Sequence, residues 1–280
     1  MILIADSGST KTSWAVIAPN DVKLITTPGI NPALHHSHAI ESVIQSELLP
    51  ALGTYKNKID LVAFYGAGCN TYGCKILSDI LRSVFNCEIG CNSDLAGSAI
   101  ATIGKDEGIV SILGTGSNSG LFINGTLKEH VPSLGYILGD EGSGSYLGKQ
   151  LLADFFKKQL PQKLAIDFEN LYHPIESEVI SAVYRNTKPN QYLASFVPFI
   201  VSNITTEYCH NLVKSSFIHF FERNICSYTD YQNYPLSFTG SVAFGFRKIL
   251  HETAEEFGMK TIHILQNPIE GMIHYYKQQL

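Results

Sequence analysis

The stretch MILIADSGSTKTSWAVIA, residues 1–18, decides the fold. In it, a β-rich run at 2–6 leads through a small-residue turn into a second β-rich run at 12–18. The turn Pro19-Asn20-Asp21 and a third run at 22–27 extend the pattern to a three-stranded meander. Apolar periodicity predicts alternating helices and strands for the rest of this half, at about 36–50 (helix), 60–65 (strand), 72–85 (helix), 87–91 (strand) and from Asp94 onward (helix).

The same plan restarts at GIVSILGTGSNSGLFI, residues 108–123. Strands are predicted at 109–113 and 118–123, and the hairpin signal Asn124-Gly125 leads into a third strand near 126–131. After a mostly helical insertion, the remaining elements are strand, helix, strand and helix, at 236–240, 242–257, 261–265 and 269–279. Each half therefore reads β-β-β-α-β-α-β-α.

The repeat predicts an α/β protein of two like-folded domains. They are expected at 1–106 and 107–280, the second with the helical insertion at about 142–230. A chain of 280 residues is long enough for two hydrophobic cores. No stretch rich in proline, serine or charge separates the halves, so the hinge is expected to be short and to lie near 104–108.

Composition excludes several function classes. The formal net charge is -5 and no run of Lys and Arg is present, which argues against nucleic-acid and membrane-surface partners. The N-terminus lacks a signal-peptide pattern, so we expect a cytoplasmic protein. Six cysteines in such a protein are expected to be reduced. The spacing Cys87-x3-Cys91 has no matching second pair, so no metal site is predicted there.

Two small-residue turns occupy equivalent positions of the repeat, each between the first two strands of its half. They are Ser7-Gly8-Ser9-Thr10-Lys11 and Gly114-Thr115-Gly116. Such turns expose backbone N–H and hydroxyl groups that suit phosphate oxygens. Each alone reads as an ordinary hairpin turn, but the repetition favours polyphosphate binding. Neither fits the P-loop pattern, in which the glycine loop leads into a helix.

Several carboxylates lie where strands end. Asp6 ends the first strand and suits a Mg²⁺ ion, or a turn-stabilising hydrogen bond. Asp94 stands between a strand and a helix, where it is suited either to cap the helix or to act as the base of a phosphoryl transfer. Asp140 lies in the glycine-flanked segment Gly139-Asp140-Glu141-Gly142-Ser143, and Gly240-Ser241 follows a strand where the backbone can approach a nucleotide.

These segments follow in the order seen in the actin, sugar-kinase and Hsp70 superfamily. The chain specifically resembles the N-acetylglucosamine kinase group, which shares its ATPase core with the BadF/BadG type. GTGSN at 114–118 and GDEGS at 139–143 are the most specific matches, and the resemblance covers essentially the whole chain. It implies two RNase H-like (actin-like ATPase) domains, each a mixed five-stranded sheet with helices on its faces, and a ligand cleft between them.

The resemblance also implies ATP and Mg²⁺ as cofactors and transfer of the γ-phosphate to the 6-hydroxyl of an N-acetylhexosamine. Asp94 is then the catalytic base and a substrate contact, and Asp6 is the metal ligand, with Asp140 as a second possibility. ATP binding is implied for Ser7, Gly8, Ser9, Thr10, Lys11, Gly114, Thr115, Gly116, Ala194, Gly240 and Ser241. Sugar binding is implied for Asn31, Ser117, Asn118, Ser133, Gly135 and Asp140.

One departure leaves the sugar open. The vertebrate kinases have Gly-Trp-Gly before GDEGS, where this chain has Ser133-Leu134-Gly135. N-acetylglucosamine is the first choice, and N-acetylmuramic acid or glucosamine are alternatives. Two other classes stay open: a BadF-type ATPase that activates a partner enzyme, and a non-catalytic sugar sensor. A homodimer is expected by resemblance.

Overall fold

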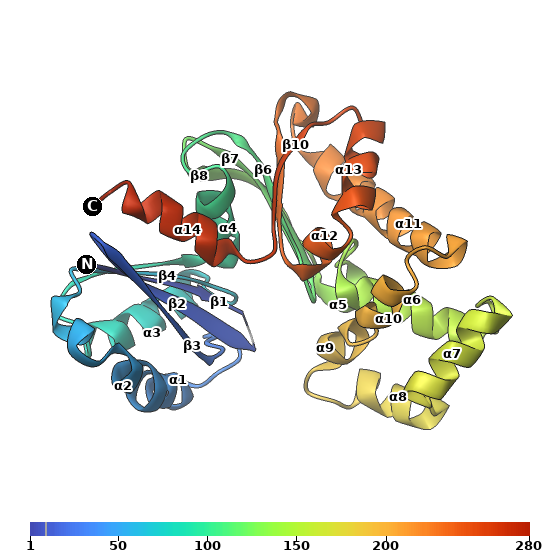
Figure 1. Cartoon of the computed structure of the whole chain (residues 1–280), viewed down its shortest axis with the longest axis horizontal. Helices are drawn as coiled ribbons and strands as arrows, with labels where there is room; N and C mark the ends of the chain where they lie inside the picture. The colour runs from blue at the N-terminus through green and yellow to red at the C-terminus, as the bar shows by residue number, and fades with distance from the viewer. Residues whose placement is uncertain (9) are drawn as a thin grey trace. The chain divides into compact units, whose positions relative to one another are not determined.

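The computed structural model describes residues 1–8 and 10–280, and it divides into two compact units. The first contains Met1–Asp106, Asn124–Thr126 and Asn267–Leu280, and the second contains Glu107–Ile123 and Leu127–Gln266. Each unit is built on one five-stranded sheet (Figure 1).

The sheet of the first unit has the strand order β3-β2-β1-β4-β5. β1 pairs antiparallel with β2 and parallel with β4, β2 pairs antiparallel with β3, and β4 pairs parallel with β5. The bounds are β1 Ile2–Ser7, β2 Lys11–Ala18, β3 Asp21–Pro28, β4 Leu61–Gly66 and β5 Glu88–Ser93. The sheet is therefore mixed, with the parallel strands β1, β4 and β5 ending at one edge.

Alternation along the strands gives this sheet two buried faces. Leu3 and Ala5 share one hydrophobic cluster with α1, α2 and α3, whereas Ile2 and Ile4 share another with α4 and α14. The helices are α1 Ser37–Val43, α2 Leu49–Leu52, α3 Thr71–Arg82, α4 Asp94–Thr102 and α14 Pro268–Lys277, with a π-helical turn at Ile44–Leu48 and a 3-10 turn at Gly53–Lys58. Figure 1 shows these two helical layers on opposite sides of the sheet.

The last helix differs from the sequence assignment, which gave it to the second domain. Ile269, Met272 and Tyr276 of α14 are buried against β1, β2 and α4, so α14 groups with the first unit. The Tyr276 hydroxyl shares a hydrogen bond of 2.6 Å with the Tyr65 hydroxyl on β4. Packing between segments this distant in sequence leaves no local pattern, so the domain limit 107–280 is corrected at its end.

The second unit repeats the strand arrangement in the order β10-β9-β6-β7-β8. β6 pairs antiparallel with β7 and parallel with β9, and β9 pairs parallel with β10. The bounds are β6 Gly108–Leu113, β7 Ser117–Ile123, β8 Thr126–Val131, β9 Leu236–Thr239 and β10 Thr261–Leu265. Positive φ angles at Asn124 and Gly125 form the predicted hairpin turn between β7 and β8. Two mixed five-stranded sheets confirm the predicted fold class.

A helical layer covers one face of this sheet. Ile109, Leu113 and Phe238 of the sheet share one core with α6, α11 and α13. The helices are α5 Gly135–Leu138, α6 Gly144–Phe156, α7 Gln162–Tyr172, α8 Glu176–Tyr184, α9 Pro189–Ala194, α10 Val197–Ser202, α11 Glu207–Arg223, α12 Ser241–Gly245 and α13 Arg247–Glu256, with 3-10 turns at Ile225–Ser227 and Tyr231–Asn233. Within residues 1–8 and 10–280, no helix combines the length and apolar character needed to cross a bilayer.

Candidate functional site

The first unit places Asp6 at the end of β1, on the face covered by α4. Ile2 and Ile4 pack with Ala96 and Ile100 of α4, and the side-chain alternation of a strand puts Asp6 on the same face. Across the sheet, Asp6 pairs with Ser13 on one side and with Tyr65 on the other. Asp6 therefore lies at the edge where the parallel strands end, on the face of the sheet that α4 covers.

Asp94 is the first residue of α4, and the helix is capped by its neighbour. The Ser93 hydroxyl accepts a hydrogen bond from the Ala96 N–H at 3.2 Å, which makes Ser93 the N-cap. Asp94 Oδ1 accepts the N–H of Leu95 at 2.8 Å. The N-cap is therefore Ser93 and not Asp94, whose carboxylate bonds one N–H of the first turn. Its carboxylate stands at the carboxyl end of β5, where open α/β sheets meet ligands.

The carboxyl groups of Asp6 and Asp94 both hold their protons more tightly than usual. Burial, followed by the negative charge of Asp94, raises the pKa of Asp6 to about 6, against a smaller opposing effect of Lys11. Burial also raises the pKa of Asp94, although backbone N–H groups oppose it. Two desolvated acids, one of which is shifted by the charge of the other, suit either a bound cation or a proton acceptor.

The turn after Asp6 begins with the buried side chain of Ser7 and continues with exposed residues. The Ser7 side chain is buried, lies 2.6 Å from the Thr12 hydroxyl and donates to the Ile30 carbonyl at 2.9 Å. Its hydroxyl therefore holds the chain after β3 in place, and the ATP contact of Ser7 stays a prediction. Gly8, Thr10 and Lys11 are exposed. Ser9, also predicted to bind ATP, lies outside the described residues.

The chain held by Ser7 carries Asn31, a predicted sugar contact. Asn31 is buried, and its Oδ1 accepts the N–H of Ala33 at 3.0 Å. A Cβ on Gly68 would lie 2.0 Å from this oxygen, so only glycine fits beside it. Gly68 also has a φ of +75°. The loops after β3 and β4 therefore fit together around the Asn31 side chain.

The second unit joins the turn after β6 to the glycine-flanked acid. Asp140 is buried, and its Oδ1 accepts the Ser117 N–H at 3.2 Å. A Cβ on Gly116 would lie 3.1 Å from the other carboxylate oxygen. Burial raises the pKa of Asp140, and the bond from Ser117 opposes that rise. Two separately predicted segments, 114–118 and 139–143, thus form one cluster.

Gly144 and Gly240 bring two further predicted segments to this turn. The Gly144 N–H donates to the Gly114 carbonyl at 2.8 Å, and a Cβ on Gly144 would lie 3.1 Å from the Cβ of Ala194. At Gly240, which has a φ of +110°, a Cβ would lie 2.4 Å from the Leu113 carbonyl oxygen. Gly144 is not among the predicted site residues, although its place one residue beyond Ser143 is a usable signal. The exposed Ser241 begins α12.

The remaining predicted sugar contacts lie on neighbouring segments. The Ser133 carbonyl accepts the Asp140 N–H at 3.1 Å, and Gly135 takes a φ of +73° at the start of α5. Asn118 on β7 accepts from the Ser119 N–H and lies 2.9 Å from Nε2 of His130. The exposed Thr115 completes the turn, and its carbonyl accepts the Ser145 N–H at 3.0 Å.

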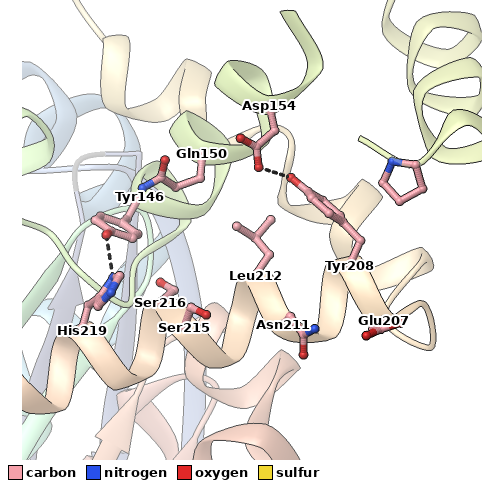
Figure 2. Close-up of a pocket in the computed structure, with 11 residues that line it drawn as sticks. Tyr146, Gln150, Asp154, Glu207, Tyr208, Asn211, Leu212, Ser215, Ser216 and His219 are labelled. Atoms are coloured by element: carbon pink, nitrogen blue, oxygen red, sulfur yellow. Dashed lines mark hydrogen bonds between the residues drawn. The ribbon is translucent and has the colours of Figure 1, made fainter. Parts of the chain in front are cut away.

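A hollow of about 490 Å³ lies elsewhere in the second unit, between α6 and α11. Figure 2 shows two side-chain hydrogen bonds across it: Tyr146 to His219 at 2.9 Å, and Tyr208 to Asp154 at 2.6 Å. Among the described residues, no predicted site residue lines this hollow. The hollow is therefore not the predicted nucleotide or sugar site, despite its size.

Comparison with known proteins shows which solved structures the chain is similar to. No protein-family profile and no curated protein matches the chain. A solved structure of a candidate N-acetylglucosamine kinase from Porphyromonas gingivalis is 40% identical, with a TM-score of 0.95 over 99% of both chains. A second such candidate, from Chromobacterium violaceum, is 14% identical, with a TM-score of 0.77 over 98% of both chains.

A ROK-family glucokinase from Streptomyces griseus, solved with glucose and AMPPNP, is 13% identical, with a TM-score of 0.51 over 98% of this chain and 97% of its own. The two distant similarities show the fold alone. The match to the Porphyromonas gingivalis protein is of another kind, because identity at that level over nearly the whole of both chains reflects common descent. On that ground the chain belongs to the N-acetylglucosamine kinase family.

Proposed function

We propose that the protein is an ATP-dependent sugar kinase that transfers the γ-phosphate to the 6-hydroxyl of an N-acetylhexosamine, with N-acetylglucosamine as the first choice. The observation that carries the proposal is the position of Asp94 and the raised pKa of its carboxyl group. Asp94 is the first residue of α4, directly after the N-cap Ser93, and its carboxyl group has a raised pKa. A phosphoryl-transfer enzyme needs such a group to orient the attacking hydroxyl and accept its proton.

The two glycine turns support nucleotide binding. At Gly114 a Cβ would meet nothing within 4 Å, and at Gly8 only the Lys11 carbonyl, at 3.8 Å. The backbone at both positions therefore borders open space that a phosphate can enter without displacing protein atoms. The glucokinase of the same fold was solved with AMPPNP, an ATP analogue. We assign Gly8, Thr10 and Lys11 in the first unit, and Gly114–Gly116 with Ala194 and Gly240–Ser241 in the second, to ATP.

The carboxylate of Asp6 fits a divalent cation. Carboxylate oxygen is the donor that Mg²⁺ prefers, and a nearby cation would favour the ionised form that burial and Asp94 disfavour. Mg²⁺ supplies charge neutralisation on the transferred phosphate. Asp140 accepts the N–H of Ser117, itself a predicted sugar contact, so we assign Asp140 to the sugar.

Sugar recognition is assigned to Asp140 and to Ser117, Asn118, Ser133 and Gly135 in the second unit, and to Asn31 in the first. The choice of an N-acetylhexosamine rests on the relative that is 40% identical and a candidate N-acetylglucosamine kinase. A site built to bond a polar substituent rejects sugars that lack it, because its own polar groups are then left unpaired.

A coupled ADP-release assay tests the proposal. Mg-ATP is offered with N-acetylglucosamine, N-acetylmannosamine, N-acetylmuramic acid, glucosamine and glucose, and Asp94→Asn is run beside the wild type. We expect release that depends on N-acetylglucosamine and disappears in the variant. Release that is equal with and without every sugar would favour the ATPase class and refute the kinase. Binding of sugar without any release would favour a sensor.

A further inference from the structure

Three cysteines from different segments gather beside the sheet of the first unit. Cys69 follows β4, Cys74 lies in α3 and Cys91 lies in β5. Their sulfur atoms all lie within 4.8 Å of one another, and Cys69 Sγ is 3.8 Å from Cys91 Sγ. Cys69 is buried and the other two are partly buried.

The spacing of the sulfur atoms matches a shared metal ion. With a Zn–S bond of about 2.3 Å, two thiolates of a tetrahedral site lie about 3.8 Å apart, which is the separation found between Cys69 and Cys91. The third sulfur needs a shift of an ångström or less. In the metal-free protein the Cys74 thiol donates a hydrogen bond to the Cys69 carbonyl at 3.5 Å, and metal binding would replace this bond.

We propose that Cys69, Cys74 and Cys91 form a three-thiolate binding site for a soft d10 metal ion of the Zn²⁺ type. Three protein ligands leave the fourth tetrahedral position to water or another small ligand. Thiolates select such ions over Mg²⁺ and Ca²⁺, so this site is chemically distinct from the carboxylates Asp6 and Asp94.

Proton balance constrains the binding step. Burial, followed by the hydrogen bond with Cys91, raises the pKa of Cys74 to about 12, and the hydrogen bond with Cys69, followed by burial, raises that of Cys91, so these two thiols are protonated in the metal-free protein. Each thiol that binds the ion loses one proton to solvent, and each S–H bond is replaced by a sulfur–metal bond. No oxidant or reductant is required.

The spacing of the cysteines in the sequence did not predict this cluster. The pair considered there was Cys87-x3-Cys91, whereas the clustered ligands are Cys69-x4-Cys74 and Cys91. Cys87 precedes β5 and is not part of the group. Cys69 and Cys74 lie in consecutive segments, and Cys91 joins them only once the loop after β4, α3 and β5 are folded together.

Titration of the reduced, metal-free full chain with Zn²⁺, in competition with a chromogenic chelator, tests the proposal. We expect one ion per chain with a dissociation constant below about 1 μM, and weaker binding by on the order of 100-fold in Cys69→Ser, Cys74→Ser and Cys91→Ser. The control variants Cys87→Ser and Cys226→Ser, at partly buried cysteines outside the cluster, should bind as the wild type does. Cd²⁺ should add thiolate-to-metal absorption that the same three variants lose.

Wild-type binding no tighter than that of a Cys69→Ser/Cys74→Ser/Cys91→Ser variant would overturn the proposal, as would equal losses in the two controls. If the Cys69→Ser variant does not fold, alkylation of the wild-type protein with and without Zn²⁺ provides a second test. Zn²⁺ should protect those three thiols, but not Cys87 or Cys226, from alkylation detected by peptide mass. Unchanged alkylation of the three would also refute the site. These readouts are independent of kinase activity.

Discussion

The two units share one strand order but differ in the chemistry of their first hairpin. β1 and β6 have the same length, and each is followed by three residues before the next strand. In that alignment Asp6 of the first unit corresponds to Ile112 of the second, and Gly8 corresponds to Gly114. The first unit therefore has an acid at the end of its first strand where the second has an apolar residue, and the second joins its turn to Asp140, Gly144 and Gly240. We infer that the acid–base and cation chemistry belongs to the first unit, whereas both turns serve nucleotide binding.

The largest effect is expected for the acid of the first unit. Asp94→Asn keeps the size and the Ser93 cap but removes the proton acceptor. We expect kcat to fall by about 10²- to 10⁴-fold while ATP affinity and melting temperature stay near those of the wild type. Steady-state kinetics over a range of ATP and sugar concentrations checks this. A kcat within a few-fold of the wild type would remove Asp94 from the base role.

The next effect concerns the stability of the second unit. Gly240→Ala adds a Cβ 2.4 Å from the Leu113 carbonyl oxygen in a backbone with a φ of +110°. We expect a loss of roughly 2–4 kcal/mol of unfolding free energy, because neither the contact nor the φ suits alanine. Urea unfolding measures it. Gly245→Ala is the matched control, since a Cβ there meets nothing within 4 Å. Equal stability of the two variants would contradict the packing described.

A smaller effect separates binding from folding at the turn of the second unit. In Gly114→Ala the new methyl meets no protein atom within 4 Å, so stability should be unchanged. It occupies space assigned to phosphate, and we expect the KM for ATP to rise by about 10-fold, or roughly 1.4 kcal/mol. Gly245→Ala again serves as the control. An unchanged KM would remove Gly114 from the nucleotide site.

The smallest effect is a pH dependence in the first unit. The folded pKa of Asp6, about 6, lies above its ordinary value of 3.8, so the native state binds the extra proton between them. Stability contributed by this group therefore falls as pH rises through that range. Without Mg²⁺, Asp6→Asn should raise the melting temperature at about pH 8 and change it little at about pH 4. A decrease at pH 8 would contradict the buried charge.

Local patterns sufficed for the strands, the turns and the acids at strand ends. They did not distinguish the roles of Ser93 and Asp94, because both are common capping residues and they are adjacent. They also did not reveal that the Ser7 hydroxyl turns inward, since that direction depends on Thr12 and Ile30, which belong to other segments.

Features made by distant segments lay beyond the sequence patterns. The placement of α14 on the first sheet depends on side chains more than 200 positions from their partners, such as Tyr276 and Tyr65. The approach of Gly240 to Leu113 joins two strands separated by a helical insertion. The cluster of Cys69, Cys74 and Cys91 has the same origin. Such contacts have no periodicity that a local pattern can detect.

The separate roles of Asp94 in catalysis and Gly114 in nucleotide binding are tested most directly by calorimetric titration of a non-hydrolysable ATP analogue into Asp94→Asn and Gly114→Ala. The kcat of each variant is measured at saturating ATP. We predict that Asp94→Asn binds the analogue like the wild type yet turns over at least about 100-fold more slowly. Gly114→Ala should bind the analogue about 10-fold more weakly and keep its kcat. Loss of nucleotide affinity in Asp94→Asn, with unchanged affinity in Gly114→Ala, would contradict the account.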